Sequence, residues 1–391
     1  MTTKETSTNA AGVFRIPLPA RITLCRVFFM FPNPMNFSYC EEFCMQRYDH
    51  GGDIYAHSQP VLDFSSNINP LGYPPGLKDA LVQNIDNYQR YPDAHCRKLK
   101  QAIAAHHGIS EDQVLCGNGA SDLIYRICAH FRSSKALIVA PTFSEYERGV
   151  YAYGGHVKEH LLKEDNHFDV DDTILNAITP DIRVVFLCSP NNPTGRLISL
   201  DLLQKIANQC QKLGIYLVLD ECFLDFTTGK SMIPFMNSYP NLLILRAFTK
   251  MYAMAGLRLG YLLSANQDLL HYIAAFGAAW SVSGPAQVAG LASLSATDWT
   301  ILTRDYVENE RAFMHNELQA LGLKVFPGEA NYLLLKSEQP LFRPLLEKGI
   351  LVRDCGNYTG LSGRFIRIGI QTRENNIKLL NALKEVHCSI A

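Results

Sequence analysis

The chain has 391 residues, with 36 lysines and arginines against 37 aspartates and glutamates, so its formal net charge is −1. At about 150 residues per domain this length predicts two to three domains, and a hydrophobic fraction of 47% is typical of a globular protein. A near-neutral chain without a clustered basic run is not expected to bind nucleic acid or a membrane surface. No apolar stretch reaches the roughly 20 residues of a membrane-spanning helix.

Eleven cysteines are spread along the chain, and their odd number and dilution predict reduced thiols rather than a disulfide scaffold. No C-x-x-C pair occurs, and the C-x3-C pair of Cys40 and Cys44 has no matching cluster of histidines or cysteines nearby. We therefore expect a cytoplasmic protein without a structural zinc site or other metal.

Residues 1–44 differ in character from the rest, with a polar start, several prolines and the short apolar run 27–31. They lack the pattern of a signal peptide, because Arg26 interrupts the apolar residues. We interpret them as an atypical N-terminal extension, poorly ordered or partly docked. A sharper hypothesis is that the functional protein begins at Met45.

From about residue 110 the chain alternates short β-branched runs with helical stretches such as 121–131 and 200–213. This alternation predicts an α/β fold, a three-layer and mainly parallel sheet covered by helices on both faces. The expected strands are 114–116, 136–140, 184–188, 215–220, 242–246 and 259–263.

We assign residues 91–285 to this large domain and residues 286–391 to a smaller α+β domain. The N-terminal segment 45–90 is expected to join the smaller domain. In the smaller domain we expect strands at 331–336, 350–353 and 365–370, and helices near 299–321 and from about 374.

Four polar segments each follow a predicted strand, and the carboxyl ends of parallel strands are where such sheets bind ligands. The segments are Gly117-Asn-Gly-Ala-Ser121, Ser189-Pro-Asn-Asn-Pro-Thr-Gly195, Asp220-Glu-Cys-Phe223 and Thr249-Lys250 with the following Arg258. Each is a plausible turn or cap by itself, but their joint occurrence in this order predicts one site.

The chemistry of these segments fits pyridoxal 5'-phosphate. Lys250 provides an amine for the cofactor's aldehyde, and burial near other cations such as Arg258 must lower its pKa from about 10.4. Asp220, at the end of a buried strand, can keep the pyridine nitrogen protonated so that the ring withdraws electrons. Asn192 can donate a hydrogen bond to the ring's phenolic oxygen.

The cofactor phosphate is expected at the start of the helix that follows Gly119, where Ala120 and Ser121 offer backbone N–H groups. Thr249 and Arg258 would complete this cradle, Arg258 through a charge-assisted contact. Gly256, between Lys250 and Arg258, would let the chain turn back.

Together these residues resemble the aspartate-aminotransferase fold family, fold type I of the pyridoxal-phosphate enzymes, over roughly residues 46–391. In that family a lysine in an S/T-K context binds the cofactor, N-P-T-G supplies the ring-oxygen donor and D-E-x-[FY] the pyridine partner. The resemblance also implies a homodimer in which Tyr91 reaches the cofactor phosphate of the partner subunit.

Two subgroups of this family fit best, the threonine-phosphate decarboxylases and the histidinol-phosphate aminotransferases. The decarboxylases are favoured by the opening His50-Gly-Gly52 and the later Leu62-Asp-Phe-Ser-Ser-Asn-Ile-Asn69, and by Trp280-Ser-Val282. Phe223 stands where aminotransferases usually carry a tyrosine, and Phe143 takes the ring-stacking position.

For the substrate, we expect Arg353, with His50 and the Gly51 backbone, to bind a phosphate. Arg367, Asn67 and Asn192 would position the remaining polar groups, so that the carboxylate is held out of the ring plane. Bidentate arginine contacts suit both anions, so the sequence leaves open which arginine takes which.

The favoured function is decarboxylation of O-phospho-L-threonine to (R)-1-amino-2-propanol O-2-phosphate for cobalamin biosynthesis. The alternative is an aminotransferase that acts on histidinol phosphate with 2-oxoglutarate. A transcriptional regulator built on this fold would need a DNA-binding winged helix, for which residues 1–44 are too short and too rich in proline.

Overall fold

The large sheet has seven strands in the order β2-β8-β7-β6-β5-β3-β4, in a computed structural model that describes residues 50–390. Every neighbouring pair is parallel except the two pairs that β8 makes, so β8 alone runs against the others in this sheet. The strands are β2 (Val114–Gly117), β3 (Lys135–Ala140), β4 (His156–Leu161), β5 (Val184–Cys188), β6 (Tyr216–Asp220), β7 (Leu242–Ala247) and β8 (Gly260–Leu263).

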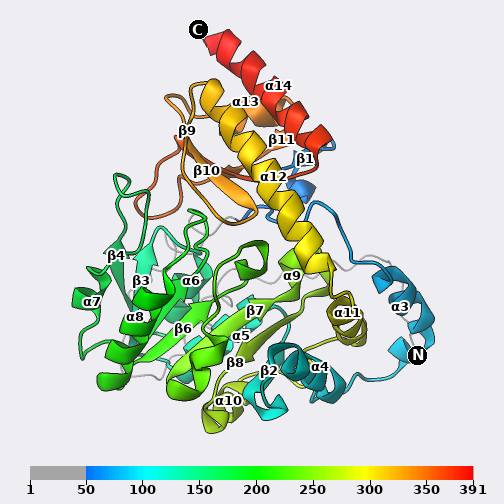
Figure 1. Cartoon of the computed structure of the whole chain (residues 1–391), viewed down its shortest axis with the longest axis vertical. Helices are drawn as coiled ribbons and strands as arrows, with labels where there is room; N and C mark the ends of the chain where they lie inside the picture. The colour runs from blue at the N-terminus through cyan, green and yellow to red at the C-terminus, as the bar shows by residue number, and fades with distance from the viewer. Residues whose placement is uncertain (1–49, 391) are drawn as a thin grey trace, which may run out of the picture. The chain divides into compact units, whose positions relative to one another are not determined.

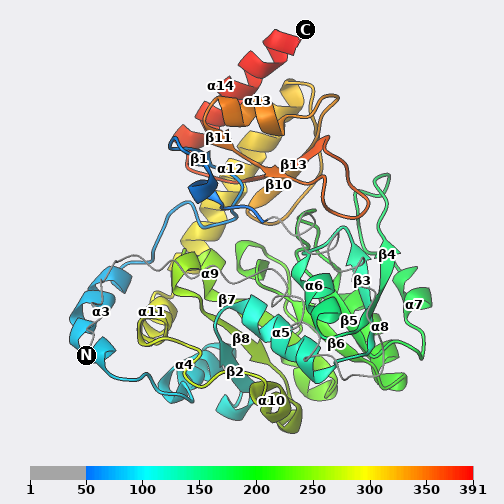
Figure 2. The same cartoon turned by 180° about the vertical axis from the view of Figure 1, so that it is seen from behind.

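Helices cover both faces of this sheet, with α8 in front of it in Figure 1 and α5 in front in Figure 2. Successive strand residues point to opposite faces. In β6, Leu217 and Leu219 share a buried cluster with Leu203 of α8, whereas Val218 packs in another cluster with Ile127 of α5. The helices of this part are α3 (Leu77–Gln83), α4 (Arg97–His107), α5 (Ala120–His130), α6 (Glu145–Ala152), α7 (Ile174–Ala177), α8 (Leu200–Lys212), α9 (Phe248–Met251), α10 (Gln267–Ala274) and α11 (Gly284–Ser295).

The smaller sheet is antiparallel, in the order β12-β13-β10-β9, and a separate parallel pair joins β1 to β11. A second core of buried side chains lies between these strands and three helices. The elements are β1 (Leu62–Asp63), β9 (Lys324–Val325), β10 (Tyr332–Lys336), β11 (Ile350–Leu351), β12 (Arg353–Asp354), β13 (Phe365–Gly369), α12 (Trp299–Ala320), α13 (Phe342–Glu347) and α14 (Arg373–Ile390).

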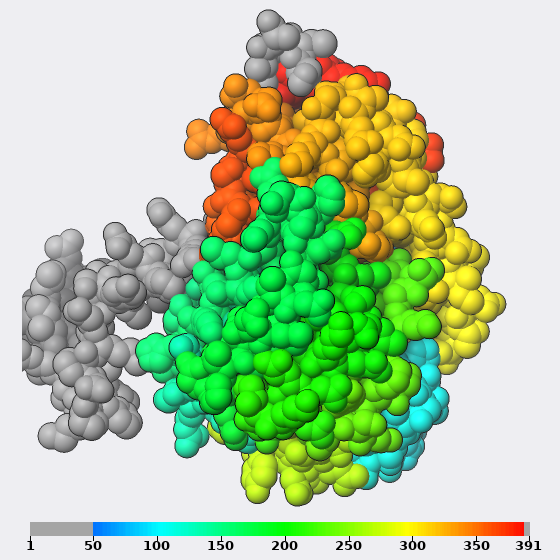
Figure 3. Space-filling model, turned by 60° about the vertical axis from the view of Figure 1, so that its left-hand side comes forward, coloured from blue at the N-terminus to red at the C-terminus, as the bar shows by residue number. Residues whose placement is uncertain are grey.

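We call the seven-stranded sheet with its helices the large lobe, and the smaller sheets with α12, α13 and α14 the small lobe. On the face shown in Figure 3 the green surface of the large lobe borders the orange surface of the small lobe. Ion pairs cross this border, where Lys324 and Lys336 both contact Glu164. Short 3-10 helices lie at Ile54–Ala56, Ile85–Gln89, Glu111–Gln113, Leu224–Phe226, Ile233–Ser238 and Ala255–Leu257.

The structure confirms the predicted α/β class and the mainly parallel three-layer sheet. Several details differ from the expected elements, and the two-residue strands β1 and β9 were not expected. The strand β4 was not expected, because His-Val-Lys-Glu-His-Leu is an edge strand whose mostly polar side chains are only partly covered. The expected strand 350–353 is two strands, because β11 pairs with β1 and β12 pairs with β13.

The expected domain boundaries at 90/91 and 285/286 stay a prediction. The β1–β11 pair attaches residues 62–63 to the small lobe, and these residues belong to the segment 45–90 that was expected to join the smaller domain. The proposed extension 1–44 and the candidate start Met45 lie outside the described residues.

Candidate active site

A cavity of about 380 Å³ lies at the carboxyl ends of β5, β6 and β7, and most of the predicted site residues line it. The exceptions are Gly119, which lies just behind the wall, and Tyr91, which lies elsewhere. The predicted residues that line the cavity are His50, Gly51, Asn67, Ala120, Ser121, Phe143, Asn192, Asp220, Phe223, Thr249, Lys250, Arg258, Arg353 and Arg367.

Lys250 lies on the one-turn helix α9, which begins directly after β7 and places the side chain on the cavity wall. Burial, and then the positive charges of Arg367 and Arg258, lower the pKa of Lys250 from 10.5 to about 8. Its ammonium nitrogen lies 5.8 Å from the centroid of the Phe223 ring. An amine with this pKa is partly neutral near pH 8 and can act as a nucleophile or a base.

Asp220 ends β6 with its carboxylate buried and both oxygens engaged. Oδ1 accepts a hydrogen bond from the backbone N–H of Cys222 at 2.9 Å, and Oδ2 accepts one from the hydroxyl of Tyr146 at 2.7 Å. Hydrogen bonds to a carboxylate favour its charged form. A buried and hydrogen-bonded carboxylate, the kind of partner that a pyridinium nitrogen requires, therefore lies at the cavity wall.

The expected phosphate cradle is built from backbone that tolerates no side chain. Gly119 has a φ of +83°, and a Cβ there would lie 2.6 Å from a guanidinium nitrogen of Arg258. A Cβ on Gly260 would lie 2.6 Å from the backbone nitrogen of Ala120. Helix α5 begins at Ala120 without a capping side chain, so its first N–H groups are available to an anion beside a cation.

Gly256, which was expected to let the chain turn back between Lys250 and Arg258, belongs to the 3-10 helix Ala255–Leu257 that directly precedes Arg258. The positive φ values fall at Ala253 (+54°) and at Arg258 itself (+59°). The left-handed backbone of Arg258 lies next to Leu259 and Gly260, where the chain enters β8.

Arg353 and Arg367 lie directly opposite each other across β12 and β13. Both are buried, and both line the cavity. Arg353 donates to the side chain of Asn357 at 2.8 Å and lies over the ring of Tyr358. Like charges in directly opposite cross-strand positions are unfavourable, so this pair favours a cavity that receives anions.

Arg367 is held in place by Asn192 and by the small lobe. One terminal nitrogen donates to Oδ1 of Asn192, and the other donates to the backbone oxygen of Ser65 at 2.5 Å. Within the described residues, Nε of Arg367 and Oδ1 of Asn67 are buried without a hydrogen-bond partner. Buried polar atoms normally have a hydrogen-bond partner, and these two belong to residues that line the cavity.

His50, the first described residue, lies at the edge of the cavity on the segment that leads to β1. Its Nε2 lies 2.7 Å from Oε1 of Glu145, and its ring lies 5.6 Å from that of Phe143. Burial alone would raise the pKa of Glu145, but the hydrogen bond and charge of His50 lower it. A Cβ on Gly51 would lie 2.1 Å from the backbone oxygen of Ser65, so only glycine fits there.

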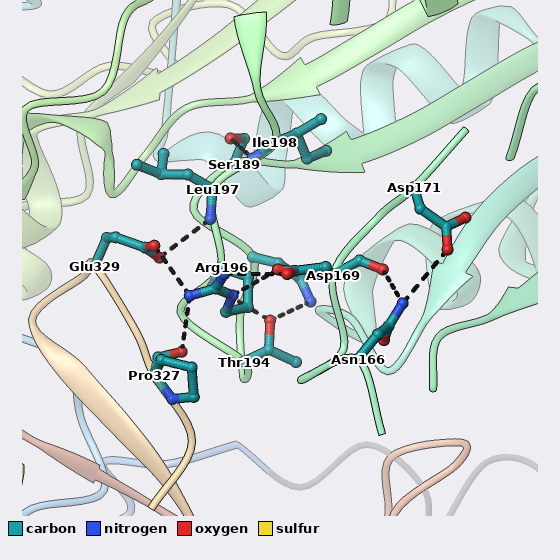
Figure 4. A network of polar contacts seen from close by, with 11 residues as sticks. Asn166, Asp169, Asp171, Ser189, Thr194, Arg196, Leu197, Ile198, Pro327 and Glu329 are labelled. Atoms are coloured by element: carbon teal, nitrogen blue, oxygen red, sulfur yellow. Dashed lines mark hydrogen bonds and ion pairs between the residues drawn. The ribbon is translucent and has the colours of Figure 1, made fainter. Parts of the chain in front are cut away.

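The turn that carries Asn192 is fixed to both lobes by a network around Arg196 (Figure 4). Arg196 forms ion pairs with Asp169 at 2.5 Å and with Glu329 at 3.1 Å. The backbone N–H of Glu329 donates to the oxygen of Gly195, and the Tyr332 hydroxyl donates to the oxygen of Asn191, both at 2.9 Å. This network holds the Asn192 backbone rigidly between the lobes.

Tyr91 lies outside its own chain's cavity. Its side chain is 80% exposed and stacks on Trp280, with the ring centroids 4.6 Å apart. A large aromatic side chain this exposed is available to a partner molecule.

Sequence reasoning missed several residues that line the cavity, above all Glu145 and Tyr146 of α6 and Ser65. The only signal was position, since Glu145 and Tyr146 follow Phe143 in the same segment. Among the described residues, no group of histidine, cysteine, aspartate and glutamate side chains is placed to hold a metal ion. No helix in the described range is long and apolar enough to cross a membrane.

The chain belongs to the aminotransferase class I and II family, whose pattern matches residues 59–383. This confirms the family inferred from the motifs and makes the protein a pyridoxal-phosphate-dependent enzyme. The residues around the cavity fit that cofactor, with an amine, a buried carboxylate and an anion cradle in one space.

Among its relatives, the threonine-phosphate decarboxylase of Salmonella typhimurium is 40% identical over 354 residues, which are 88% of this chain and 97% of that protein. The structure of L-threonine-O-3-phosphate decarboxylase from Porphyromonas gingivalis matches with a TM-score of 0.74 and 28% identity, covering 83% of this chain and 98% of that one. The histidinol-phosphate aminotransferase of Clostridium acetobutylicum matches with a TM-score of 0.79 and 31% identity, covering 84% and 100%.

Proposed function

We propose that the protein decarboxylates O-phospho-L-threonine to (R)-1-amino-2-propanol O-2-phosphate, as a step of cobalamin biosynthesis. The 40% identity to a threonine-phosphate decarboxylase over nearly the full length of that protein supports this substrate. We place the enzyme in the cytoplasm, and the free thiols of the seven buried cysteines from Cys96 to Cys355 support a reducing compartment.

The observation that carries the proposal is the cross-strand pair of Arg353 and Arg367 in the cavity that also holds Lys250. O-phospho-L-threonine carries two anionic groups, a phosphate and a carboxylate, on a short carbon chain. Two buried arginines in opposite cross-strand positions offer one guanidinium group for each anion, and charge-assisted contacts of this kind are strong and directional.

We assign the substrate phosphate to Arg353, His50 and the Gly51 backbone. A second cavity of about 590 Å³ shares His50, Gly51 and Arg353 with the first, so these residues lie where the two spaces meet. We assign the other substrate groups to Arg367, Asn67 and Asn192, which line the same cavity. This arrangement fixes which bond at Cα stands perpendicular to the cofactor ring.

When bound, the pyridoxal ring supplies an electron sink for the negative charge that develops at Cα as the bond to the carboxylate breaks. Asp220 holds the proton on the pyridine nitrogen. The backbone N–H groups of Ala120 and Ser121, with Thr249 and Arg258, hold the cofactor phosphate, and Phe143 packs on the ring face. Lys250 would hold the cofactor through its amine and would act as the acid that returns a proton to Cα.

Phe223 supports decarboxylation over transamination. Its ring packs edge-on against Tyr332 at 5.1 Å and carries no hydroxyl. The ring oxygen of the cofactor therefore receives one hydrogen bond fewer than it would from a tyrosine, and Asn192 is left as the proposed donor.

A single assay tests this function. Purified protein loaded with pyridoxal phosphate is incubated with O-phospho-L-threonine and no keto acid, and we expect release of CO2 in step with loss of substrate. The second candidate is histidinol-phosphate aminotransferase, which the TM-score of 0.79 favours. Turnover of histidinol phosphate that depends on 2-oxoglutarate, without CO2 from phosphothreonine, would replace the first proposal by the second.

We also propose a homodimer in which Tyr91 completes the cofactor site of the partner subunit. The exposed stack of Tyr91 on Trp280 supports this, because it lies outside its own chain's cavity. Analytical ultracentrifugation should give twice the chain mass of 43.8 kDa, and Tyr91→Ala should weaken cofactor binding by about tenfold, as expected for loss of a hydrogen bond to a charged group. A fully active monomer contradicts this proposal.

A further inference from the structure

Tyr146 is a buried tyrosine whose hydroxyl donates to the carboxylate beneath the proposed cofactor ring. It lies in the first turn of α6 with its side chain fully buried, and its oxygen is 2.7 Å from Oδ2 of Asp220. Burial, and then the negative charge of Asp220, raise the pKa of Tyr146 far above 10. The phenol therefore stays protonated at neutral pH and acts as the donor in this bond.

The hydroxyl is separable from the packing of the ring. The Tyr146 ring stacks on Phe186, with centroids 5.4 Å apart and an angle of 17°, and meets Phe143 edge-on at 5.7 Å. A phenylalanine at this position would keep these contacts, because they involve only the ring. The effect of the hydroxyl can therefore be separated from that of the ring. The group that it affects is its hydrogen-bond acceptor, Asp220.

A carboxylate that accepts a hydrogen bond is stabilised as an anion, so its affinity for a proton falls. Asp220 already accepts from the Cys222 backbone, and Tyr146 adds a second donor on the other oxygen. When such a carboxylate faces a pyridinium N–H, a lower proton affinity leaves the proton on nitrogen. Loss of the second donor would weaken the hold of Asp220 on the proton of a bound ring nitrogen.

We propose that Tyr146 is a positioning residue whose hydroxyl holds the Asp220 carboxylate in place to face the cofactor's ring nitrogen, so that this nitrogen stays protonated. The inference rests on the proposed role of Asp220 and is independent of which substrate the enzyme uses. It adds to the site a residue whose proposed effect on the cofactor is exerted through Asp220.

The experiment uses full-length protein loaded with pyridoxal phosphate labelled with 15N in the ring, and NMR reads the protonation of that nitrogen directly. Tyr146→Phe should shift the 15N signal from the protonated toward the neutral position, and should raise the dissociation constant for pyridoxal phosphate about tenfold. Asp220→Asn provides the reference for a ring that has lost its anionic partner.

The matched control is Tyr261→Phe, which removes another buried tyrosine hydroxyl, one that contacts His107 at 2.8 Å. This control should leave the 15N signal unchanged. A Tyr146→Phe signal that stays at the wild-type position while Asp220→Asn shifts would overturn the role of Tyr146 and leave the proposed function intact. If Asp220→Asn also leaves the signal unchanged, the assignment of Asp220 fails, and the inference fails with it.

Discussion

Replacing Lys250 with alanine should abolish turnover of O-phospho-L-threonine. Of the described residues that line the cavity, Lys250 is the only lysine, so no other lysine there can bind the cofactor or return a proton to Cα. General acid–base catalysis alone contributes about 10²- to 10⁴-fold, so we expect activity to fall by at least this factor, measured as CO2 released per mole of protein. Lys205→Ala, which removes an exposed lysine in surface ion pairs, should retain full activity.

The lowered pKa of Lys250 adds a pH dependence to this prediction. The neutral amine attacks the cofactor's aldehyde, and its fraction rises as pH increases toward and past about 8. The rate at which cofactor-free protein regains its colour with pyridoxal phosphate should therefore rise through this range and then level off. A Lys250→Ala variant that still releases CO2 at a tenth of the normal rate contradicts the assignment.

Replacing Arg353 with glutamine should weaken binding of the phosphorylated substrate far more than it slows the reaction of the bound complex. Truncating one partner of a buried, hydrogen-bonded charge pair costs about 2–5 kcal/mol, so kcat/KM should fall by roughly 30- to 4000-fold. Most of this loss should be an increase in KM, because the phosphate lies away from the bond that breaks. Steady-state kinetics with varied O-phospho-L-threonine measure both parameters.

Two further variants make this test specific. Arg353→Lys should recover only part of the loss, because an ammonium group cannot make the bidentate contact of a guanidinium. Arg364→Gln removes an exposed arginine one residue before β13 and should leave KM unchanged. An unchanged KM in Arg353→Gln would move the phosphate to another part of the cavity.

The elements that the sequence predicted best are those buried on both faces. The strands β5, β7 and β8 consist only of buried residues, so their apolar runs are visible without knowledge of the fold. The edge strand β4 has no such run, because one side of it has no neighbouring strand to cover it. Its six residues are mostly polar, and nothing in their pattern distinguishes them from a loop.

Some residues of the candidate site could likewise be predicted from the sequence, and others could not. Residues that follow directly on a strand, such as Asp220 and Lys250, could be placed together because parallel strands end at one edge. Tyr146 could not, because spacing alone does not show which side chain of the first turn of α6 reaches Asp220. Arg353 and Arg367 were both singled out, but fourteen residues of sequence do not reveal that strand register sets them opposite each other.

The hydrogen bond from Arg367 determines how the side-chain amide of Asn192 is oriented. A carboxamide has one end that accepts hydrogen bonds and one end that donates them. Arg367 can only donate, so it occupies the oxygen end of Asn192 and prevents the group from turning over. The amino end of Asn192 is then the part that remains to donate to an oxygen of a ligand. In this way Arg367, a cation of the small lobe, determines whether Asn192 of the large lobe presents a donor or an acceptor to the cavity.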